Sequence, residues 1–319
     1  MRVTRNQVAE LAKVSSATVS RVFNSPSSVS KSLRDAVYEA SNKLGYKPNK
    51  NAALLRRSST GVICVVEIDK SNRPYYWGSL NMFDWFYGQA MRGLHSAIEN
   101  TSYQLNFCKI SSREELDRVV LNCDGVIGYD IDDDEEESLF LDLNVPYLLA
   151  HHILPSNKYN HVSTNNKQGG IIQGKYLKSL NCKKPLYITG YLDKVIAHSQ
   201  RLEGIKSVYP DLTIMEVPFI EQDKINELIL SIKESFENNE YDSLAAVNDY
   251  TLTKVLLKIG GTFPAIGYDS APFTKFLNRS VASIDLNIEG IYKSALTNLI
   301  KHINGSPVES LTVSPKLVL

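Results

Sequence analysis

Residues 4–24 read TRNQVAELAKVSSATVSRVFN, and this stretch decides the fold of the first part of the chain. Thr4 with Gln7 three positions later forms a capping-box pattern, which predicts a helix beginning directly after Thr4. A short turn follows, and Ser15 is placed to cap a second helix. The apolar face of that helix consists of Val19, Val22 and Phe23. Two short helices joined in this way predict a helix-turn-helix.

A third amphipathic helix is predicted from Lys31 to Leu44, behind a Ser30 cap and ended by Gly45. Three helices of this size can share one small core, so we expect a small all-α head. The second helix would present its front to DNA, where a recognition helix meets the edges of bases. The residues predicted to face outward there are Ser16, Ala17, Ser20 and Arg21. A three-helix bundle without a role in DNA binding is the alternative.

The charge of the chain is divided unevenly. Residues 1–60 contain eleven Lys or Arg and three Asp or Glu. Because the whole chain has 35 of each kind, the remainder holds 24 basic and 32 acidic side chains. A basic head gains affinity for DNA by releasing counterions from phosphates. The acidic body is repelled by DNA, which would orient the molecule.

The head continues as LGYKPNKNAALLRRS at residues 44–58. This stretch and VSSATVSRVFN at residues 14–24 resemble the lactose-repressor (LacI/GalR-type) family of bacterial transcriptional regulators. In that family the hinge forms a short helix when two subunits sit on the operator, and a leucine wedges into the minor groove. The matching residue is Leu55, and an apolar wedge of this kind kinks the duplex. An ordinary linker packed on the core is the alternative for this segment.

The resemblance also implies which residues contact the operator. Ser16, Ala17 and Arg21 match base-reading positions, and of these only Arg21 can make a bidentate contact with guanine. The full set of predicted DNA-binding residues is Thr4, Ser15, Ser16, Ala17, Thr18, Ser20, Arg21, Asn24, Lys31, Arg34, Lys50, Ala52, Leu55 and Arg56. Among them, the predicted phosphate contacts are Thr4, Asn24, Lys31, Arg34 and Lys50.

From Gly61 onward, apolar strand-like segments alternate with amphipathic stretches, which predicts an α/β body with parallel sheets. The strand-like segments are 62–68, 104–108, 125–129, 146–150, 185–189, 244–247 and 264–267. The helical stretches include 82–100, 167–180, 201–209, 224–238 and 250–259. The resemblance implies two Rossmann-like subdomains, as in periplasmic binding proteins. Its marks in the body are Asn165-Asn166-x-x-Gly169-Gly170, Arg201-Leu202-x-Gly204, Asn248-Asp249 and Gly267-Tyr268-Asp269.

These observations together predict the division of the chain. We expect a helix-turn-helix DNA-binding domain at 1–46, a hinge helix and linker at 47–60, and an effector-binding and dimerisation domain at 61–319. Within the last, subdomain N would comprise about 61–162 and 286–315, and subdomain C about 163–285. The chain ends at Leu319 without a heptad-repeat helix for tetramerisation, so a homodimer is expected.

A ligand of an open parallel sheet sits beyond the carboxyl ends of its strands. The predicted effector-binding residues are Asp69, Tyr75, Tyr76, Trp77, Tyr129, Arg201, Phe219, Asn248 and Asp269. Arg201, Asn248 and Asp269 match family effector contacts, and such groups can fork hydrogen bonds to vicinal hydroxyls. Asn248 and Asp249 could instead cap the next helix. Arg201 is expected at a helix start, where its charge opposes the dipole and so favours a ligand role.

One strand end departs from the family pattern. His151 and His152 stand where many relatives have Asp-Arg. The acidic run at residues 130–137 lacks the spacing and the central Gly of a calcium loop, and is interpreted as a solvated loop that enters a helix.

Signals of catalysis are absent from the sequence. Residues 169–175 fit Gly-x4-Gly-Lys, but Tyr176 replaces the Ser or Thr that would hold magnesium. No pattern pairs a nucleophile with a base, so we predict neither an enzyme nor a cofactor or metal. Cys64, Cys108, Cys123 and Cys182 contain no Cys-x-x-Cys pair and are interpreted as reduced core thiols. With no signal peptide, this predicts a cytoplasmic protein.

The leading interpretation is a homodimeric repressor on a palindromic operator. A small molecule, predicted to be a sugar of a carbohydrate-utilisation operon, would switch its affinity for DNA. A regulator responding to a purine or a partner protein is the alternative. An enzyme or transport-binding body with a DNA-binding head is a further one. The sequence leaves open the effector, the direction of its effect, the operator and the regulated genes.

Overall fold

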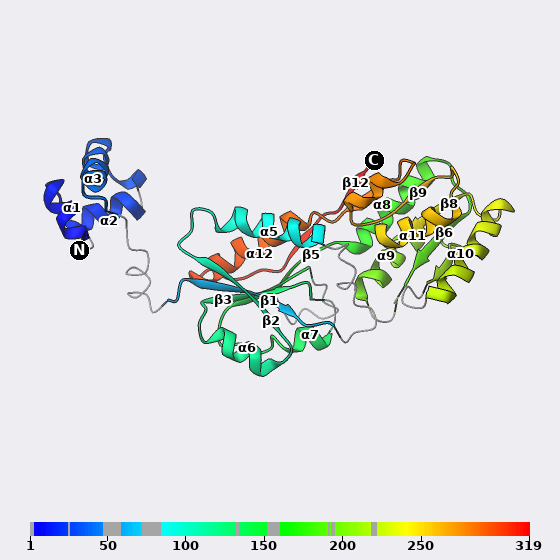
Figure 1. Ribbon diagram of the computed structural model, residues 1–319, viewed down its shortest axis with the longest axis horizontal. Helices are drawn as coiled ribbons and strands as arrows, with labels where there is room; N and C mark the ends of the chain where they lie inside the picture. The colour runs from blue at the N-terminus through cyan, green and yellow to red at the C-terminus, as the bar shows by residue number, and fades with distance from the viewer. Residues whose placement is uncertain are drawn as a thin grey trace. The chain divides into compact units, whose positions relative to one another are not determined.

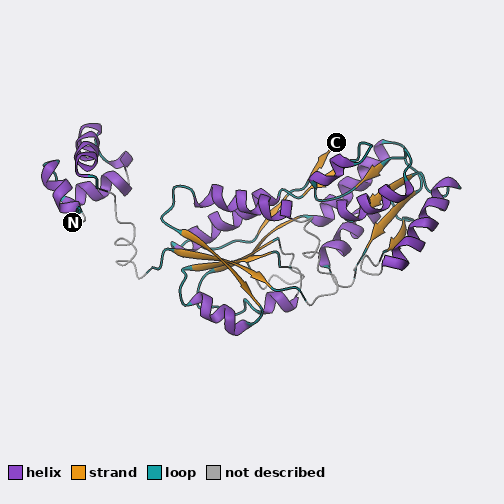
Figure 2. Ribbon diagram, viewed as in Figure 1, coloured by secondary structure: helices purple, strands orange, loops and turns teal. Residues whose placement is uncertain are grey.

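The computed structural model describes residues 3–24, 26–46, 59–71, 84–131, 134–151, 160–190, 192, 195–217 and 222–319. The chain divides into two compact units, Met1–Thr60 and Gly61–Leu319, which we call the head and the body. Figure 1 labels the elements and Figure 2 shows that the head is helical whereas the body combines helices with parallel sheets.

The described part of the head contains the three predicted helices. They are α1 (Arg5–Leu11), α2 (Ser16–Asn24) and α3 (Lys31–Leu44), with a 3-10 turn, η1 (Pro26–Ser28), between the last two. Their shared core consists of Val8, Ala9, Val19, Val22, Val37 and Ala40. The capping box is confirmed: the backbone N–H of exposed Thr4 donates to Gln7 Oε1 at 2.8 Å, and Thr4 Oγ1 accepts from the backbone N–H of Gln7. Gly45 ends α3 in the left-handed conformation, as predicted. Ser30 occupies the N-cap position of α3, but its side chain makes no capping hydrogen bond.

The N-subdomain of the body is a six-stranded parallel sheet in the order β11-β5-β4-β3-β1-β2. Its strands are β1 (Val62–Ile68), β2 (Gln104–Ile110), β3 (Gly125–Tyr129), β4 (Tyr147–Ala150), β5 (His161–Thr164) and β11 (Leu311–Val313). Helices α5 (Asp84–Ile98) and α12 (Ile288–Ile303) cover one face, and α6 (Arg113–Val120) and α7 (Asp134–Ser138) lie on the other (Figure 1). Alternate residues of β1 therefore enter two different cores.

The C-subdomain is built on a four-stranded parallel sheet in the order β7-β6-β8-β9. Its strands are β6 (Pro185–Thr189), β7 (Thr213–Glu216), β8 (Ser243–Ala246) and β9 (Ala265–Ile266). Its helices are α8 (Asn166–Ser179), α9 (Ile196–Lys206), α10 (Gln222–Glu237) and α11 (Asp249–Ile259), with the 3-10 segment η4 (Pro272–Phe276). Strand β10 (Ser283–Asp285) pairs antiparallel with β12 (Lys316–Val318). The chain crosses between the subdomains after β5, after β10 and after β11.

The predicted alternation of strands and helices is confirmed, with two kinds of difference. The strands β5, β7, β10, β11 and β12 were not predicted, because they are short and three of them are largely exposed. The helix expected at 201–209 begins at Ile196, five residues earlier. The expectation that Arg201 stands at a helix start is therefore wrong, and Arg201 lies in the middle of α9.

Candidate DNA-binding head and effector site

The outward face of α2 carries the predicted base-reading residues. Ala17 and Arg21 are exposed, and Ser16 and Ser20 are half-buried. The Ser16 hydroxyl accepts a hydrogen bond from Arg5 Nε at 2.6 Å, so α1 and α2 are tied together at this face. Arg21 thus remains the long cation of this surface that can reach a guanine edge.

Several of the other predicted DNA contacts also stabilise the head. Ser15 Oγ accepts from the backbone N–H of Thr18 at 3.0 Å and caps α2 as predicted. Arg34 Nη1 donates to the carbonyl oxygen of Pro26 at 2.8 Å, which joins α3 to η1. Lys31 is exposed at the first residue of α3. Asn24 is the last residue of α2. The remaining predicted DNA contacts, which lie outside the described residues, are Lys50, Ala52, Leu55 and Arg56.

Arg201 is the best-connected predicted effector residue. Its side chain is almost fully buried, at 4% exposure. Nε donates to Asn166 Oδ1 and Nη1 donates to the carbonyl oxygen of Val247, both at 2.8 Å. Nη1 also lies 3.4 Å from Asp269 Oδ1, and the guanidinium stacks 3.9 Å from the centre of the Tyr268 ring. The start of α8 and the segments that follow β8 and β9 thus all contact this cation of α9, which fixes its position.

Two glycines bring α8 and α9 close enough for this arrangement. A Cβ on Gly204 would overlap the carbonyl oxygen of Lys167, and a Cβ on Gly170 would overlap that of Arg201. The two helix backbones are therefore in direct contact, as small residues permit. This contact places Asn166 of α8 beside Arg201 of α9. The glycines in the two sequence marks thus act by positioning the cation.

Asp269 follows β9 and faces the other subdomain. Burial raises the pKa of Asp269 to about 6, although the charges of Arg201 and His151 oppose that rise. The charge of Asp130 raises the pKa of Asp269 as well. Because Asp130 and His151 belong to the N-subdomain, the strand ends of the two subdomains face each other across the body. This is the place where the sequence predicts the effector.

The raised pKa of Asp269 makes a testable prediction about stability. A carboxyl whose pKa is higher in the folded state stabilises it below the unfolded pKa of 3.8, and this contribution is lost as pH rises through about 6. Between pH 5 and pH 7 the wild-type protein should lose about 1–2 kcal/mol of unfolding free energy relative to Asp269→Asn. Denaturant titrations at the two pH values measure this difference. Asp211→Asn, at an exposed position, is the control. Equal pH dependence in all three proteins would contradict the assignment.

The N-subdomain presents a charged cluster at the ends of β1, β3 and β4. Lys70, which is 5% exposed, donates to the carbonyl oxygen of Asp130 and lies 3.7 Å from Asp130 Oδ2 and 3.4 Å from Glu136 Oε2. His151 Nδ1 lies 3.1 Å from Asp130 Oδ1. Burial raises the pKa of Asp130, but Lys70 and His151 outweigh it and hold that pKa below its usual value. Asp130 and His151 both have positive φ, a conformation that is costly for these residues and is found preferentially at functional sites.

This cluster corrects the interpretation of the acidic run. Residues 130–137 were expected to form a solvated loop that enters a helix. Glu136 and Glu137 of α7 are instead buried, at 1% and 2% exposure. Lys70 explains how Glu136 is accommodated, because a buried carboxylate is tolerated when it is paired with a cation. The pairing joins residues far apart in the sequence, so no local pattern could predict it.

Asn248 caps the next helix, as one alternative predicts, whereas Asp249 has a different structural role. Asn248 Oδ1 accepts from the backbone N–H of Thr251 at 2.8 Å and caps α11. Asp249 accepts from the hydroxyl of Ser283 and the backbone N–H of Ala271, so it ties α11 to β10 and η4. Burial and the charge of Asp269 raise the pKa of Asp249 well above its usual value. Asn248 is 6% exposed at the end of β8, so a ligand role for it remains a prediction.

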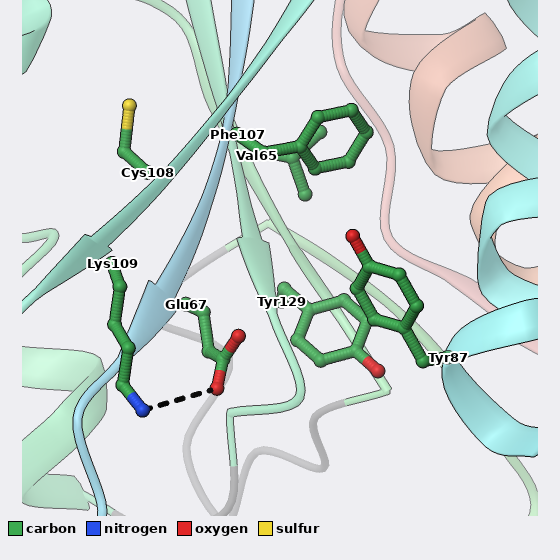
Figure 3. A pocket seen from close by; sticks show the side chains of 7 residues that line it. All are labelled: Val65, Glu67, Tyr87, Phe107, Cys108, Lys109 and Tyr129. Atoms are coloured by element: carbon green, nitrogen blue, oxygen red, sulfur yellow. Dashed lines mark ion pairs between the residues drawn. The ribbon is translucent and has the colours of Figure 1, made fainter. Parts of the chain in front are cut away.

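Asp69 and Tyr129 lie at the ends of β1 and β3 but are not brought into contact with Arg201. Asp69 Oδ1 accepts from the backbone N–H of Ser71 at 3.1 Å and lies 3.3 Å from Lys109 Nζ. Tyr129 packs against aromatic rings of α5 and α12. It also lines a pocket of about 180 Å³ on the β1-β2-β3 face (Figure 3), which is smaller than an ordinary ligand site. The residues lining this pocket are Val65, Glu67, Tyr87, Phe107, Cys108, Lys109 and Tyr129.

The other predicted effector contacts, which lie outside the described residues, are Tyr75, Tyr76, Trp77 and Phe219. The structure adds residues that the sequence analysis did not assign to the site, namely Lys70, Asp130, His151, Asn166, His198 and Tyr268. Lys70, Asp130 and Tyr268 are chain neighbours of residues that were assigned, so the signal for these three was their position at strand ends. His198 was not signalled: burial and the charge of Arg201 lower its pKa to about 3, so the ring is neutral and its Nδ1–H donates to Gly190 O.

Within the described residues, no group of three or more His, Cys, Asp or Glu side chains is arranged to hold a metal ion. None of the described helices combines the length and the apolar character that a membrane span requires.

Comparison with known proteins agrees with this geometry. The family described as bacterial regulatory proteins, lacI family, matches residues 5–49. The sucrose operon repressor of Streptococcus mutans serotype c is 27% identical, over 93% of this chain and 92% of its own length. The HTH-type transcriptional repressor PurR of Aliivibrio fischeri (strain MJ11) is 25% identical, over 94% of this chain and 91% of its own length. The solved structure of a transcriptional regulator CelR–cellobiose complex covers 100% of this chain and 99% of its own, with a TM-score of 0.64 and 22% identity.

The family match covers the helix-turn-helix whose capping box and core are described above, and the similar proteins extend over both head and body. Residues 5–49 thus match the lacI family of bacterial regulatory proteins, and the whole chain is similar in sequence to repressors such as the sucrose operon repressor.

Proposed function

We propose that the protein is a transcriptional repressor that binds a palindromic operator as a homodimer and changes its operator affinity when a small molecule binds between the two subdomains. The observation that carries this proposal is that one chain contains both features. Its head has a recognition helix with an exposed Arg21, and its body has a buried Arg201–Asp269 ion pair that faces the other subdomain. Protein two-fold symmetry would be mirrored in the operator half-sites. A protein of this role would act in the cytoplasm, beside the chromosome. We keep the predicted limits 1–46, 47–60 and 61–319 as part of this proposal.

The proposed effector is a neutral sugar, and the regulated genes are those of a carbohydrate-utilisation operon. An ionised Asp269 accepts hydrogen bonds from hydroxyls, and Arg201 beside it donates them. On the opposite side, Asp130 accepts and His151 can donate. The cations Lys70 and Arg201 are each already paired with carboxylates of their own subdomain. A polyhydroxylated ligand suits such alternating donors and acceptors.

A thermal-shift screen of the full-length protein tests the effector class. Sucrose, cellobiose and ribose represent sugars, and hypoxanthine and guanine represent purines. We expect at least one sugar to raise the melting temperature, because a ligand that binds only the folded state stabilises it. Stabilisation by purines alone would favour a purine as the effector. The similarity to the repressor PurR supports this second candidate. If no small molecule bound, a partner protein would become the preferred effector.

A catalytic role for the body is tested in the same samples. A regulator returns its ligand unchanged, whereas an enzyme converts it. Recovery of intact sugar after prolonged incubation with the protein is the expected result. Formation of a product that depends on protein concentration would replace the repressor assignment by an enzymatic one.

Arg21→Ala should weaken specific operator binding by about 1–3 kcal/mol, because the variant loses the bidentate contact with guanine. Binding to random DNA should weaken less, since phosphate contacts remain. Lys43→Ala removes an exposed cation from α3 and controls for the loss of charge alone. Gel shifts on operator and random DNA measure both affinities. An equal loss on both DNAs would contradict a base-reading role for Arg21.

A further inference from the structure

The backbone that carries Asp269 has a conformation that needs support from its surroundings. Asp269 and Ser270 have φ angles of 100° and 54°, so two consecutive residues other than glycine have positive φ. Such conformations are costly, and they persist only where the surrounding structure holds them. The backbone of Asp269 also sets where its carboxylate lies relative to Arg201. The contacts that hold this segment therefore bear on the candidate effector site.

Two side chains hold the residues that follow Asp269. The backbone N–H of Ala271 donates to Asp249 Oδ2 at 2.7 Å, and the backbone N–H of Ser270 donates to Ser283 Oγ at 2.9 Å. The Ser283 hydroxyl in turn donates to the Asp249 carboxylate, at 2.9 Å from Oδ1 and 2.8 Å from Oδ2. Asp249 and Ser283 are 0% and 5% exposed, so water does not compete for these bonds. We call these two residues the Asp249–Ser283 clamp.

Two backbone hydrogen bonds complete the attachment of the segment. The carbonyl oxygen of Tyr268 accepts from the backbone N–H of Asp249 at 2.7 Å. The backbone N–H of Asp269 donates to the carbonyl oxygen of Ile284 at 2.7 Å. Each residue from 268 to 271 is thus hydrogen-bonded to the start of α11 or to β10.

The Asp249 carboxylate is not needed to begin α11, because Asn248 already caps that helix. Its partners lie instead in the segment after Asp269 and in β10. Burying a carboxylate is costly unless it is hydrogen-bonded, so filling space does not account for it. A Cβ on Gly267 would overlap Asp249 Oδ1, so the glycine leaves room for the carboxylate. Two of the sequence marks in the body, at 248–249 and 267–269, therefore meet in one arrangement.

We propose that Asp249 and Ser283 are positioning residues of the effector site, which hold Asp269 where its carboxylate can accept hydrogen bonds from the hydroxyl groups of a sugar. This inference rests on the proposed function, because it requires Asp269 to bind the effector. Neither residue of the clamp has to touch the ligand. A carboxylate that is already held in place loses little freedom when the ligand arrives, so the clamp raises the affinity for the ligand.

Calorimetric titration of the full-length protein with sucrose, cellobiose and ribose tests this role. Ser283→Ala removes one side of the clamp, and we expect the affinity for a sugar that binds the wild type to fall about tenfold or more. Ser243→Ala is the matched control. Ser243 is a buried serine at the start of β8 that donates to Asp242 Oδ1 at 2.8 Å, at the opposite end of the sheet from Asp269. This control should bind the sugar as the wild type does.

A double variant separates a positioning role from a general loss of structure. If the clamp acts through Asp269, then Ser283→Ala should add little to the loss of sugar affinity that Asp269→Asn causes alone. A general loss of structure would add in full. Additive losses, an unchanged sugar affinity in Ser283→Ala, or an equal fall in Ser243→Ala would each overturn the proposal.

Hydrogen exchange of the backbone amides tests the clamp without any ligand. Ser270 and Ala271 lie outside strands and helices, yet their amides should exchange slowly in the wild type because they donate to buried side chains. Ser283→Ala should speed the exchange of Ser270, and Ser243→Ala should not. Fast exchange of both amides in the wild type would overturn the proposal even if a variant failed to fold. If no sugar bound the wild type, the proposed effector class would fail, and the exchange rates would still decide whether the clamp holds this segment.

Discussion

Replacing Arg201 with methionine is expected to lower the free energy of unfolding by about 3–5 kcal/mol and to abolish the response to the effector. Methionine keeps much of the side-chain volume but removes the charge. The Asp269 carboxylate and the Asn166 amide would then lose their cationic partner inside the protein. Breaking a buried pair by removing one partner is costly because the remaining charge stays buried and uncompensated. Denaturant titration measures the loss.

Two further variants make this result interpretable. Arg92→Met removes an arginine that is 62% exposed in its side chain and pairs with Glu289 at 3.3 Å. An exposed pair of this kind contributes at most about 1 kcal/mol, so the cost should be small. Combining Arg201→Met with Asp269→Asn also removes the negative charge that Arg201→Met leaves uncompensated. The double variant should therefore recover part of the lost stability. A loss for Arg201→Met as small as that for Arg92→Met would show that Arg201 is not the centre of the buried network.

The second large effect is expected for Gly204→Ala, with a loss of about 2–3 kcal/mol. The new methyl group would overlap the carbonyl oxygen of Lys167, which belongs to the backbone of α8 and cannot rotate away. The two helices must therefore separate, and the Arg201–Asn166 hydrogen bond lengthens with them. Thermal or denaturant unfolding measures the loss of stability, and the effector response should weaken in parallel.

Gly88→Ala is the matched control for this substitution. Gly88 lies in α5, and a Cβ built there has no atom within 4 Å. Alanine should stabilise a helix at such a position by about 0.5–1 kcal/mol. The same substitution is thus predicted to lower the stability of the protein at Gly204 and to raise it at Gly88. A stabilising Gly204→Ala would mean that α8 and α9 are not in backbone contact.

The head could be predicted nearly residue by residue because its signals are local. The capping box at Thr4, the Ser15 cap and Gly45 each act within a few residues of the chain. The start of α9 was missed for the converse reason. Val195 at its N-cap makes no side-chain capping bond, so nothing local announces a helix at Ile196.

Some residues of the candidate effector site could be predicted from the sequence, but the contacts between them could not. Arg201 and Asp269 were assigned because they match effector contacts of the family that the sequence resembles, and the structure brings them together. Asn248 caps α11, and its ligand role stays a prediction. The partners of Lys70 lie 60 and 66 residues further along the chain, so only the folded sheet reveals them. Close approach of Gly204 to Lys167 is likewise a property of packing rather than of pattern.

The most direct test of the central claim is the operator affinity of wild type and Arg201→Met, each measured with and without the sugar that stabilises the wild-type protein. The operator is a two-fold symmetric site selected from genomic fragments by the full-length protein. We predict that the sugar changes the operator affinity of the wild type by about 5–150-fold, a coupling of about 1–3 kcal/mol, and leaves that of Arg201→Met unchanged. Without sugar, the two proteins should bind the operator equally. An equal response to sugar in both proteins, or failure to select any symmetric site, would contradict the claim.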